Sequence, residues 1–362
     1  GPSALLFGSS AIGGVVNVVD SRIPRTIPDE AIHVDALATY GSAANERSGG
    51  VRVDVPVTKS LVVHFDGSYV KTGDLEIGGH VLTPALRAQA ATSADAAIAS
   101  LADLMGELPN SGGRTWEIAG GAAYISNNAN FGVSVGRYDS LYGVPIRYSL
   151  DPAVEAEAVR LDVKQTRVDV RGEINPAEGF LEAIRLRGGY ADYRHNELEE
   201  DGTVGTTFNN IGTEARFEVV QRERNGWSGA IGAQFLFRKL NIVGAEKFLP
   251  PSKTRQFGIF TTQSFDMGAL RAEVGARIEH AIVSAAADAS LGNLDIKRRF
   301  TSYSGSIGGR YEVARGWTFG LNGSYTQRAP SAEELFPNGP HAGTQAFEIG
   351  DPTFGKEKST GL

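Results

Sequence analysis

The sequence of 362 residues contains no cysteine. Disulfide bonds, zinc–thiolate centres and cysteine nucleophiles are therefore excluded. It also lacks an unbroken apolar run of about 20 residues, the length that a membrane-spanning helix needs. Positive charge is not in excess, because 35 lysines and arginines stand against 42 acidic residues and give a net charge of −7. Since no basic stripe is present, we expect no nucleic-acid partner.

What the sequence has instead is a hydrophobic pattern that repeats every two residues. Over segments of roughly ten residues, apolar and polar side chains alternate, which is typical of β-strands. One such segment alternates Leu270, Val274 and Ile278 with Arg271 and Glu273. We count about thirteen such segments between residues 31 and 328, with another beginning near residue 357. The chain is therefore predicted to be all-β and antiparallel.

Aromatic residues stand at both ends of the apolar face of several predicted strands. Trp116 is followed by Tyr124, and Trp317 by Tyr325. A spacing of about eight residues at ~3.3 Å each matches an apolar band about 25 Å tall with an aromatic girdle at each border. The pattern favours a transmembrane β-barrel over a soluble sandwich, although core aromatics are the simpler interpretation of any single pair.

The connections between the predicted strands alternate in length, which is typical of outer-membrane barrels with short turns on one side and long loops on the other. The short connections are 56–60, 126–129, 175–179, 224–226, 266–268 and 314–316. The long ones are 41–50, 73–113, 139–160, 196–210, 240–252, 284–297 and 329–357.

Residues 84–108, inside the second long loop, are predicted to form one helix. Apolar residues recur there at spacings of three and four, Thr83 can cap the start, and Pro84 suits the first turn. The helix is too short and too polar to cross a bilayer, so we expect it on the outer surface, folded over the barrel mouth.

Both ends of the sequence contain stretches that resemble TonB-dependent outer-membrane receptors. Residues 1–20, "GPSALLFGSSAIGGVVNVVD", resemble the last part of the plug domain of that family, and residues 21–28 then resemble the linker to the barrel. The stretches "RAPSAEELFPNGPH" at 328–341 and "FEIGDP" at 347–352 resemble a recurrent outer loop. The resemblance divides the chain into a plug end with linker (1–28) and the N-terminal part of the barrel (29–362).

This resemblance implies a location in the outer membrane of a Gram-negative bacterium, in contact with its lipid. It also implies an active-transport receptor whose plug is pulled by the TonB energy-coupling complex. Such barrels close with about 22 strands, so 13 or 14 would leave two free edges. We therefore expect a fragment that cannot transport alone, because the start of the plug and the TonB-contacting segment would precede residue 1.

A narrower resemblance is to the zinc-uptake branch of the family. The stretches that carry it are "LYGVP" at 141–145, "YADYRHNELE" at 190–199, "GTTFNN" at 205–210 and "GAEKFLPP" at 244–251. It implies that a scarce nutrient, zinc or another metal ion or a metal chelate, is bound at the outer loops and plug. Receptors of that branch often carry a histidine-rich insertion after the first stretch. Here that loop has no histidine, so zinc capture by it is not expected.

The histidines supply the candidate metal ligands, since imidazole and carboxylate are usual ligands of zinc and similar ions. On the resemblance, Glu246 and His341 match outer-loop ligands of the zinc branch, and the remaining ligands would lie in the plug before residue 1. His195, with Asp192 and Glu197 near it in the sequence, is a second candidate. Four of the six histidines fall in or beside the predicted outer loops, namely His80, His195, His280 and His341. The competing interpretation is that such loops hold much of the polar sequence in any case.

Enzyme-like patterns lack their structural context. Residues 132–136 fit G-x-S-x-G but lie within an alternating strand, and residues 350–356 have the P-loop spacing without the Ser or Thr that should follow. We therefore predict no enzyme and no bound cofactor, with zinc only as cargo. The alternatives left open are a receptor for a siderophore or other organic ligand, a passive porin or adhesin barrel, and a soluble all-β protein.

Overall fold

The structure is a computed structural model that describes residues 3–154, 156–341 and 346–362. Its main feature is one antiparallel sheet of 14 strands. The strands are β1 (His33–Gly41), β2 (Glu46–Pro56), β3 (Leu61–Thr72), β6 (Gly113–Ile125), β7 (Ala129–Gly143), β8 (Arg160–Ile174), β9 (Leu181–Leu198), β10 (Val204–Arg224), β11 (Trp227–Gly244), β12 (Ser252–Asp266), β13 (Leu270–Ala285), β14 (Ile296–Ala314), β15 (Trp317–Arg328) and β18 (Glu357–Gly361).

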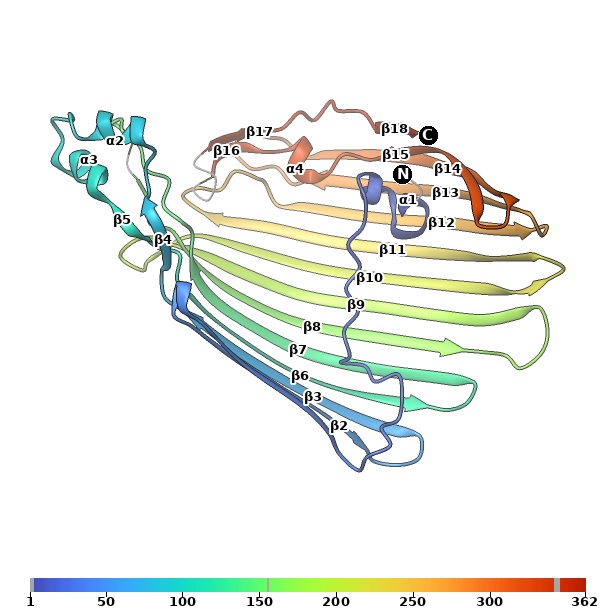
Figure 1. Cartoon of the computed structure of the whole chain (residues 1–362). Coiled ribbons are helices and arrows are strands. Elements are labelled where there is room, and N and C mark those ends of the chain that lie inside the picture. Colours follow the sequence, from blue (N-terminus) through green and yellow to red (C-terminus); the bar gives the residue numbers. More distant parts are fainter. Residues whose placement is uncertain (1–2, 155, 342–345) are drawn as a thin grey trace.

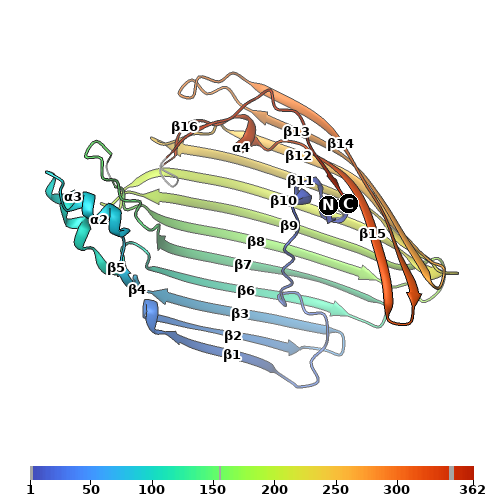
Figure 2. The same cartoon turned by 45° about the horizontal axis from the view of Figure 1, so that its top comes forward.

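The sheet is a simple meander, in which every strand pairs with the next one in this series. It curves into an open trough, with β1 at one edge and β18 at the other (Figures 1 and 2). The thirteen strands predicted between residues 31 and 328, and the fourteenth near residue 357, are confirmed. The prediction of an all-β antiparallel fold is confirmed with them.

The predicted tight turns are confirmed at one end of the sheet. One of the two shortest joins β10 to β11 through Asn225 and Gly226, whose φ angles of 54° and 77° are both positive. Two consecutive positive φ angles define the hairpin turn whose twist matches the flanking strands, and Asn-Gly is its preferred sequence. We call this the turn end of the sheet and the opposite end the loop end.

Several predicted long loops are shorter than expected. β9 runs to Leu198 and β10 starts at Val204, so only residues 199–203 of the predicted loop 196–210 lie outside strands. Likewise β11 extends to Gly244, and the first predicted loop, 41–50, shrinks to a 3₁₀ turn, η2 (Ser42–Ala44), followed by Asn45. The loops are shorter because the backbone hydrogen bonds between neighbouring strands continue beyond the residues in which apolar and polar side chains alternate.

The predicted helix over 84–108 is wrong as a single element. The segment forms α2 (Pro84–Ala90), α3 (Ala96–Ser100) and a 3₁₀ turn, η3 (Leu101–Asp103). Asp95 starts the second helix, because its carboxylate accepts hydrogen bonds from the backbone amides of Ala97 and Ile98. The end of the segment is a strand, β5 (Met105–Leu108), which pairs with β4 (Leu75–His80). In both views these elements extend beyond the strands at the loop end (Figures 1 and 2).

The convex face of the sheet is apolar and exposed. Phe235, Ile259, Ile278 and Ile307 are between 40% and 70% exposed, an arrangement that water would not favour and a bilayer would. No helix among the described segments is both long and apolar enough to cross a membrane.

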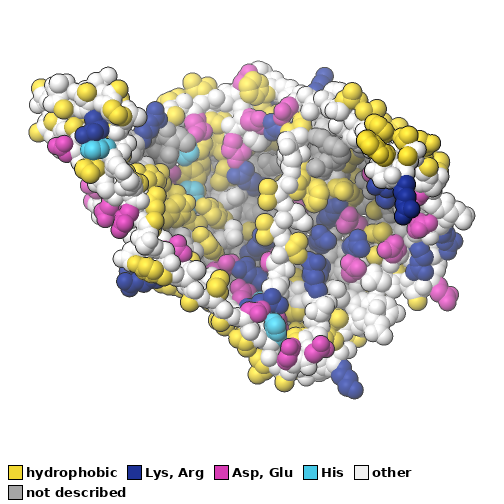
Figure 3. Space-filling view, viewed as in Figure 1, with side chains coloured by type: hydrophobic (Ala, Val, Ile, Leu, Met, Phe, Trp, Pro, Cys, Tyr) yellow, Lys and Arg dark blue, Asp and Glu magenta, His cyan; other side chains and the backbone are white. Residues whose placement is uncertain are grey.

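The N-terminal segment crosses the concave face of the sheet, passing from α1 (Ser3–Phe7) and a 3₁₀ turn, η1 (Ser9–Ile12), to β1 (Figures 1 and 2). The guanidinium of Arg171 donates to the carbonyl oxygen of Pro24 at 3.1 Å. Gly121 lies directly beneath the segment, where a Cβ would collide with the carbonyl oxygen of Arg22. Acidic and basic side chains lie on both sides of the segment in this hollow (Figure 3). The division at residue 28 stays a prediction.

The largest apolar cluster lies at the loop end on the concave side. There the segment after β15, which contains α4 (Ala332–Leu335), folds back onto the strands and onto the connection between β11 and β12. The side chains that fill the cluster include Phe208, Ile242, Phe248, Leu249, Val283, Phe300, Leu335 and Phe336. This packing fixes the short hairpin of β16 (Asn338–His341) and β17 (Ala346–Ile349) beside the ends of β9 and β10.

Candidate functional site

His195 faces the concave side of the sheet near the loop end, on β9 rather than in a loop. Its cross-strand partner is Phe208 on β10. The two rings stack, with centroids 4.2 Å apart and planes inclined by 15°. The strand register therefore holds the imidazole in a fixed orientation.

His341 reaches the same place from β16. Its ring stacks on Phe248 with centroids 4.3 Å apart and lies 6.1 Å from Phe208. The two phenylalanine rings are themselves 6.1 Å apart, so they form an aromatic wall with one imidazole on each. The structure thus brings together two residues that are far apart in the sequence and that were predicted separately.

Two carboxylates accompany these imidazoles. Glu348 Oε1 lies 2.7 Å from His341 Nδ1, and Glu197 Oε1 lies 3.8 Å from His341 Nε2. Glu197 is only 5% exposed. We call His195, Glu197, His341 and Glu348, with the wall of Phe208 and Phe248, the mouth cluster.

The mouth cluster contains polar atoms without partners. Within the described part of the chain, Glu197 Oε2 and His195 Nδ1 are buried and make no hydrogen bond. An unsatisfied buried polar atom costs about 1–3 kcal/mol, and native proteins keep few of them without a reason. A bound ligand or an ordered water would satisfy both atoms.

Glu246 lies in the connection between β11 and β12, two residues before Phe248, and is half-buried. It is close enough to Glu197 for the two carboxylates to repel each other. In the described residues its carboxylate makes no hydrogen bond or ion pair. The structure therefore places Glu246 at the border of the mouth cluster, with no ion pair to His341 among the described residues.

The other histidines predicted near loops do not join this cluster. His280 lies on the convex face of β13, where its Nδ1 is 3.2 Å from Thr301 Oγ1, and His80 ends β4 in the separate hairpin. No three of the described histidine, aspartate and glutamate side chains stand close enough to ligate one ion. The mouth cluster therefore offers part of a ligand set.

Ion pairs hold the loops around the mouth cluster. Arg328 donates two hydrogen bonds to Glu334 of α4, at 2.7 and 2.8 Å, and lowers the pKa of that carboxyl to about 2. On the neighbouring loops, Lys247 donates to Asp288 and holds the pKa of that carboxyl below its usual value. These loops therefore stay charged and paired at neutral pH.

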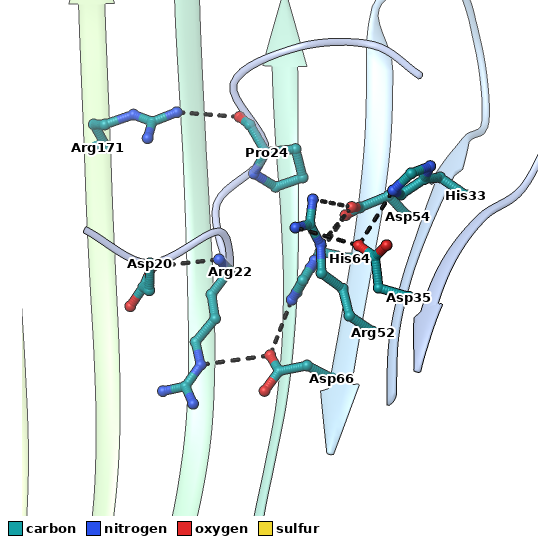
Figure 4. Close-up of polar contacts among 10 residues, drawn as sticks. All are labelled: Asp20, Arg22, Pro24, His33, Asp35, Arg52, Asp54, His64, Asp66 and Arg171. Atoms are coloured by element: carbon teal, nitrogen blue, oxygen red, sulfur yellow. Dashed lines mark hydrogen bonds and ion pairs between the residues drawn. The ribbon is translucent and has the colours of Figure 1, made fainter. Parts of the chain in front are cut away.

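A second histidine lies on the concave face, and it is fully partnered (Figure 4). His64 of β3 is 1% exposed, and its two ring nitrogens lie 2.7 Å from Asp54 Oδ1 and 2.9 Å from Asp66 Oδ2. Arg22 of the N-terminal segment lies 3.4 Å from Asp66 and 2.6 Å from Glu117. We call Asp54, His64 and Asp66 the inner-wall triad.

The alternation of β2 and β3 places the members of this triad on one face, but only the register, which sets Asp54 opposite His64, brings them into contact. Sequence reasoning also missed Phe208, Phe248 and Glu348. The cross-strand pairing of His195 with Phe208 was the one signal available for Phe208, and it required the correct end of β9. Phe248 and Glu348 lie in other segments, which this pairing does not involve.

A family model described as TonB-dependent receptor-like β-barrel matches residues 107–362. The chain belongs to this family. Its members are transport receptors rather than enzymes, and they lie in the outer membrane of Gram-negative bacteria. The predicted family, fold class and location are thereby confirmed, and the sheet is part of the wall of such a barrel.

Solved structures of the same fold include the copper transporter OprC, with a TM-score of 0.71 and 13% identity, covering 93% of this chain and 51% of that one. The hemophore receptor HasR of Serratia marcescens, in complex with HasA and heme, gives 0.71 and 13%, covering 92% and 50%. The FrpB iron transporter from Neisseria meningitidis gives 0.66 and 12%, covering 84% and 47%. The chain thus spans about half the length of these relatives. The resemblance to the zinc-uptake branch stays a prediction.

Proposed function

We propose that this chain forms part of an outer-membrane receptor that binds a scarce nutrient, a metal ion or a metal chelate, and imports it. Energy would come from the TonB complex, acting on a plug of which residues 1–28 are the end. The proposal is supported by the family and by the N-terminal segment docked on the concave face, which a passive porin would not need. The observation that most supports a bound cargo is the mouth cluster, in which Glu197 Oε2 and His195 Nδ1 are buried without a partner among the described residues.

The side-chain types favour a borderline metal such as zinc. Imidazole nitrogen and carboxylate oxygen are its usual protein ligands in the absence of cysteine. We propose His341 and Glu246 as ligands, with His195 as the weaker candidate. Because no three of the described side chains converge on one point, the set would be completed by plug residues or by a chelator that arrives with the metal.

The aromatic wall favours a second candidate, an organic chelate such as a siderophore. Two phenylalanine rings beside a few oriented polar groups are typical of sites for small organic ligands. A chelate would stack against Phe208 and Phe248 and accept or donate hydrogen bonds at the open atoms of the mouth cluster. It would depend on these rings far more than a bare ion would.

Zinc binding by the full-length receptor tests the proposal. Isothermal titration calorimetry would compare wild type with His341→Ala, Glu246→Ala and Phe248→Leu. The matched control is His280→Ala, which removes an imidazole on the convex face. We expect His341→Ala to weaken zinc affinity at least tenfold, about 1.4 kcal/mol, and the control to bind like wild type. Unchanged zinc affinity in both His341→Ala and Glu246→Ala would exclude the proposed ion site, and uptake of chelates by Phe248→Leu then decides the second candidate.

A further inference from the structure

Cations form two rows on the convex face of the sheet near the loop end. The strand register sets Lys239 of β11 opposite Lys253 of β12, Lys253 opposite Ser284 of β13, and Ser284 opposite Lys297 of β14. The second row lies two residues closer to the turn end on each strand and consists of Phe237, Arg255, Ile282 and Arg299. We call the five cations the outer-wall patch.

The alternation along each strand fixes the direction of these side chains. All five cations are exposed, whereas their strand neighbours Leu240, Ser252 and Phe300 are buried on the concave side. The patch therefore shares its face with the exposed apolar residues of the same strands, such as Phe257, which is 49% exposed.

The cations of the outer-wall patch have no acidic partners. Among the described residues none of the five forms an ion pair, and the one ring contact is that of the Arg255 guanidinium, 5.8 Å from the centre of Phe237. On the concave face, by contrast, Arg277 of β13 pairs with Glu279 at 2.6 Å, and on β10, adjacent to β11, Arg216 pairs with Glu218 at 2.8 Å. Like charges in rows repel each other unless an anion lies between them.

A cavity lies within the patch. It has a volume of about 460 Å³ and is open to the surface. Its lining includes the three lysines, the Ser284 hydroxyl and, as its one acidic side chain, Asp295. The space has the size and the donor groups for a phosphorylated headgroup.

The level of the patch in the membrane follows from β11. The apolar face of this strand runs from Trp227 to Phe237, about 33 Å along the strand and, at a tilt of about 40°, about 25 Å across the bilayer. Lys239 is the next outward-facing residue beyond that band. In bacterial barrels the long loops face the cell exterior, so the patch lies at the headgroup level of the outer leaflet.

We infer that the outer-wall patch binds the phosphate groups of an anionic lipid in the outer leaflet. An occupant at this level must carry negative charge toward the lysines and hydrocarbon toward the apolar band below, which a phosphorylated lipid does. Ammonium and guanidinium groups are the side chains that hold phosphate best. Arg47, Lys71 and Arg114 form a similar row across β2, β3 and β6, so the outer rim is cationic at a second place.

Native mass spectrometry of the purified full-length receptor tests this inference, with bis-phosphorylated lipid A as the probe. The variant is Lys239→Gln/Lys253→Gln/Lys297→Gln. The matched control, Lys59→Gln/Arg224→Gln/Arg315→Gln, removes the same charge from exposed residues at the turn end. We expect the first variant to retain at least tenfold less lipid A than wild type, and the control to retain as much as wild type.

Two further measurements identify the source of the bound phosphate group. Wild type should bind dephosphorylated lipid A no better than the first variant does, and inorganic phosphate should not displace the lipid. Equal retention by the first variant and wild type would overturn the inference, as would phosphate displacing the lipid at matched concentration. Ser284→Val, which removes a hydroxyl and keeps every charge, gives a milder second variant and should lower retention severalfold. Metal binding at the mouth cluster does not enter these measurements.

Discussion

Two histidines on the concave face differ in how completely they are partnered. In the inner-wall triad, both ring nitrogens of His64 meet carboxylate oxygens within 2.9 Å. In the mouth cluster, His195 Nδ1 and Glu197 Oε2 are buried with no partner in the described residues. A complete buried network rigidifies a structure, whereas an incomplete one is unstable until something completes it. The difference separates a structural histidine from the one that we propose as a ligand.

The neighbours of the two sites support this separation. The triad is joined to the N-terminal segment through Arg22, which lies 3.4 Å from Asp66. The mouth cluster is surrounded by loops and aromatic rings near the loop end of the sheet. One site therefore joins the segment to the wall, and we propose the other, at the loop end, as the place where cargo binds.

Asp54→Ala should have the largest effect on stability. It removes the carboxylate that buried His64 and Arg52 share, and breaking a buried pair in this way costs about 3–5 kcal/mol. We expect that loss in the free energy of unfolding of the full-length receptor in denaturant, with zinc affinity unchanged. Asp35→Ala, at a carboxylate that is 58% exposed, is the control and should cost under about 1 kcal/mol. Equal losses from both variants would contradict the structural role of the triad.

Gly121→Ala should loosen the N-terminal segment. The added methyl group would collide with the carbonyl oxygen of Arg22, and overpacking of this kind costs about 1–3 kcal/mol. We expect faster cleavage by trypsin after Arg22 or Arg25 in the folded receptor. At Gly120, on the same strand but the opposite face, the nearest atom to a Cβ is 3.8 Å away, so Gly120→Ala is the control. Trypsin resistance equal to wild type in the Gly121 variant would show that the contact does not hold the segment.

Glu197→Gln should act in the opposite way to Asp54→Ala. It removes a buried charge whose Oε2 lacks a partner and whose Oε1 is 3.8 Å from His341 Nε2, so the free energy of unfolding should stay the same or rise by about 1 kcal/mol. Zinc affinity should fall about tenfold, because the carboxylate beside His341 is lost. Calorimetry and denaturant unfolding on the same preparation measure both quantities. A loss of stability with no loss of affinity would make Glu197 a structural residue.

The smallest effect is expected from Glu334→Gln. The Glu334 side chain is 39% exposed, so its ion pair with Arg328 should contribute about 1 kcal/mol or less. The pKa of Glu334 is lowered to about 2. Its stabilisation is therefore fully present above the ordinary pKa of about 4.5 and is lost as the pH falls through about 2. Wild type and variant should differ in the free energy of unfolding at pH 7 and much less at pH 2, where Glu334 is half protonated in the folded receptor. An undiminished difference at pH 2 would contradict this assignment.

The strands could be predicted from the sequence because their signal is local. Alternation such as that around Val274 is complete within one strand, and the Asn225–Gly226 turn carries its own conformational requirement. The prediction of one helix over 84–108 was wrong for an equally local reason, because Asp95 caps a new helix in the middle of the apolar pattern. Strand ends were harder, since the ladder between β9 and β10 continues through residues of mixed polarity.

The candidate site was predictable only as separate residues. His195 and His341 could be named from their chemistry and from the family resemblance. His195 and His341 come close together because each stacks on a phenylalanine, Phe208 or Phe248, from another segment. Their proximity also requires the loop after β15 to fold back over the strands. Long-range packing of this kind leaves no periodic signal in a single sequence.

Anomalous X-ray scattering from zinc in crystals of the full-length receptor would locate the bound ion. We expect a zinc peak at the mouth cluster, about 2.0–2.1 Å from an imidazole nitrogen of His341 or His195. We expect no peak at His64. A peak between Asp54 and Asp66, or an empty mouth cluster at saturating zinc, would contradict the proposed metal site.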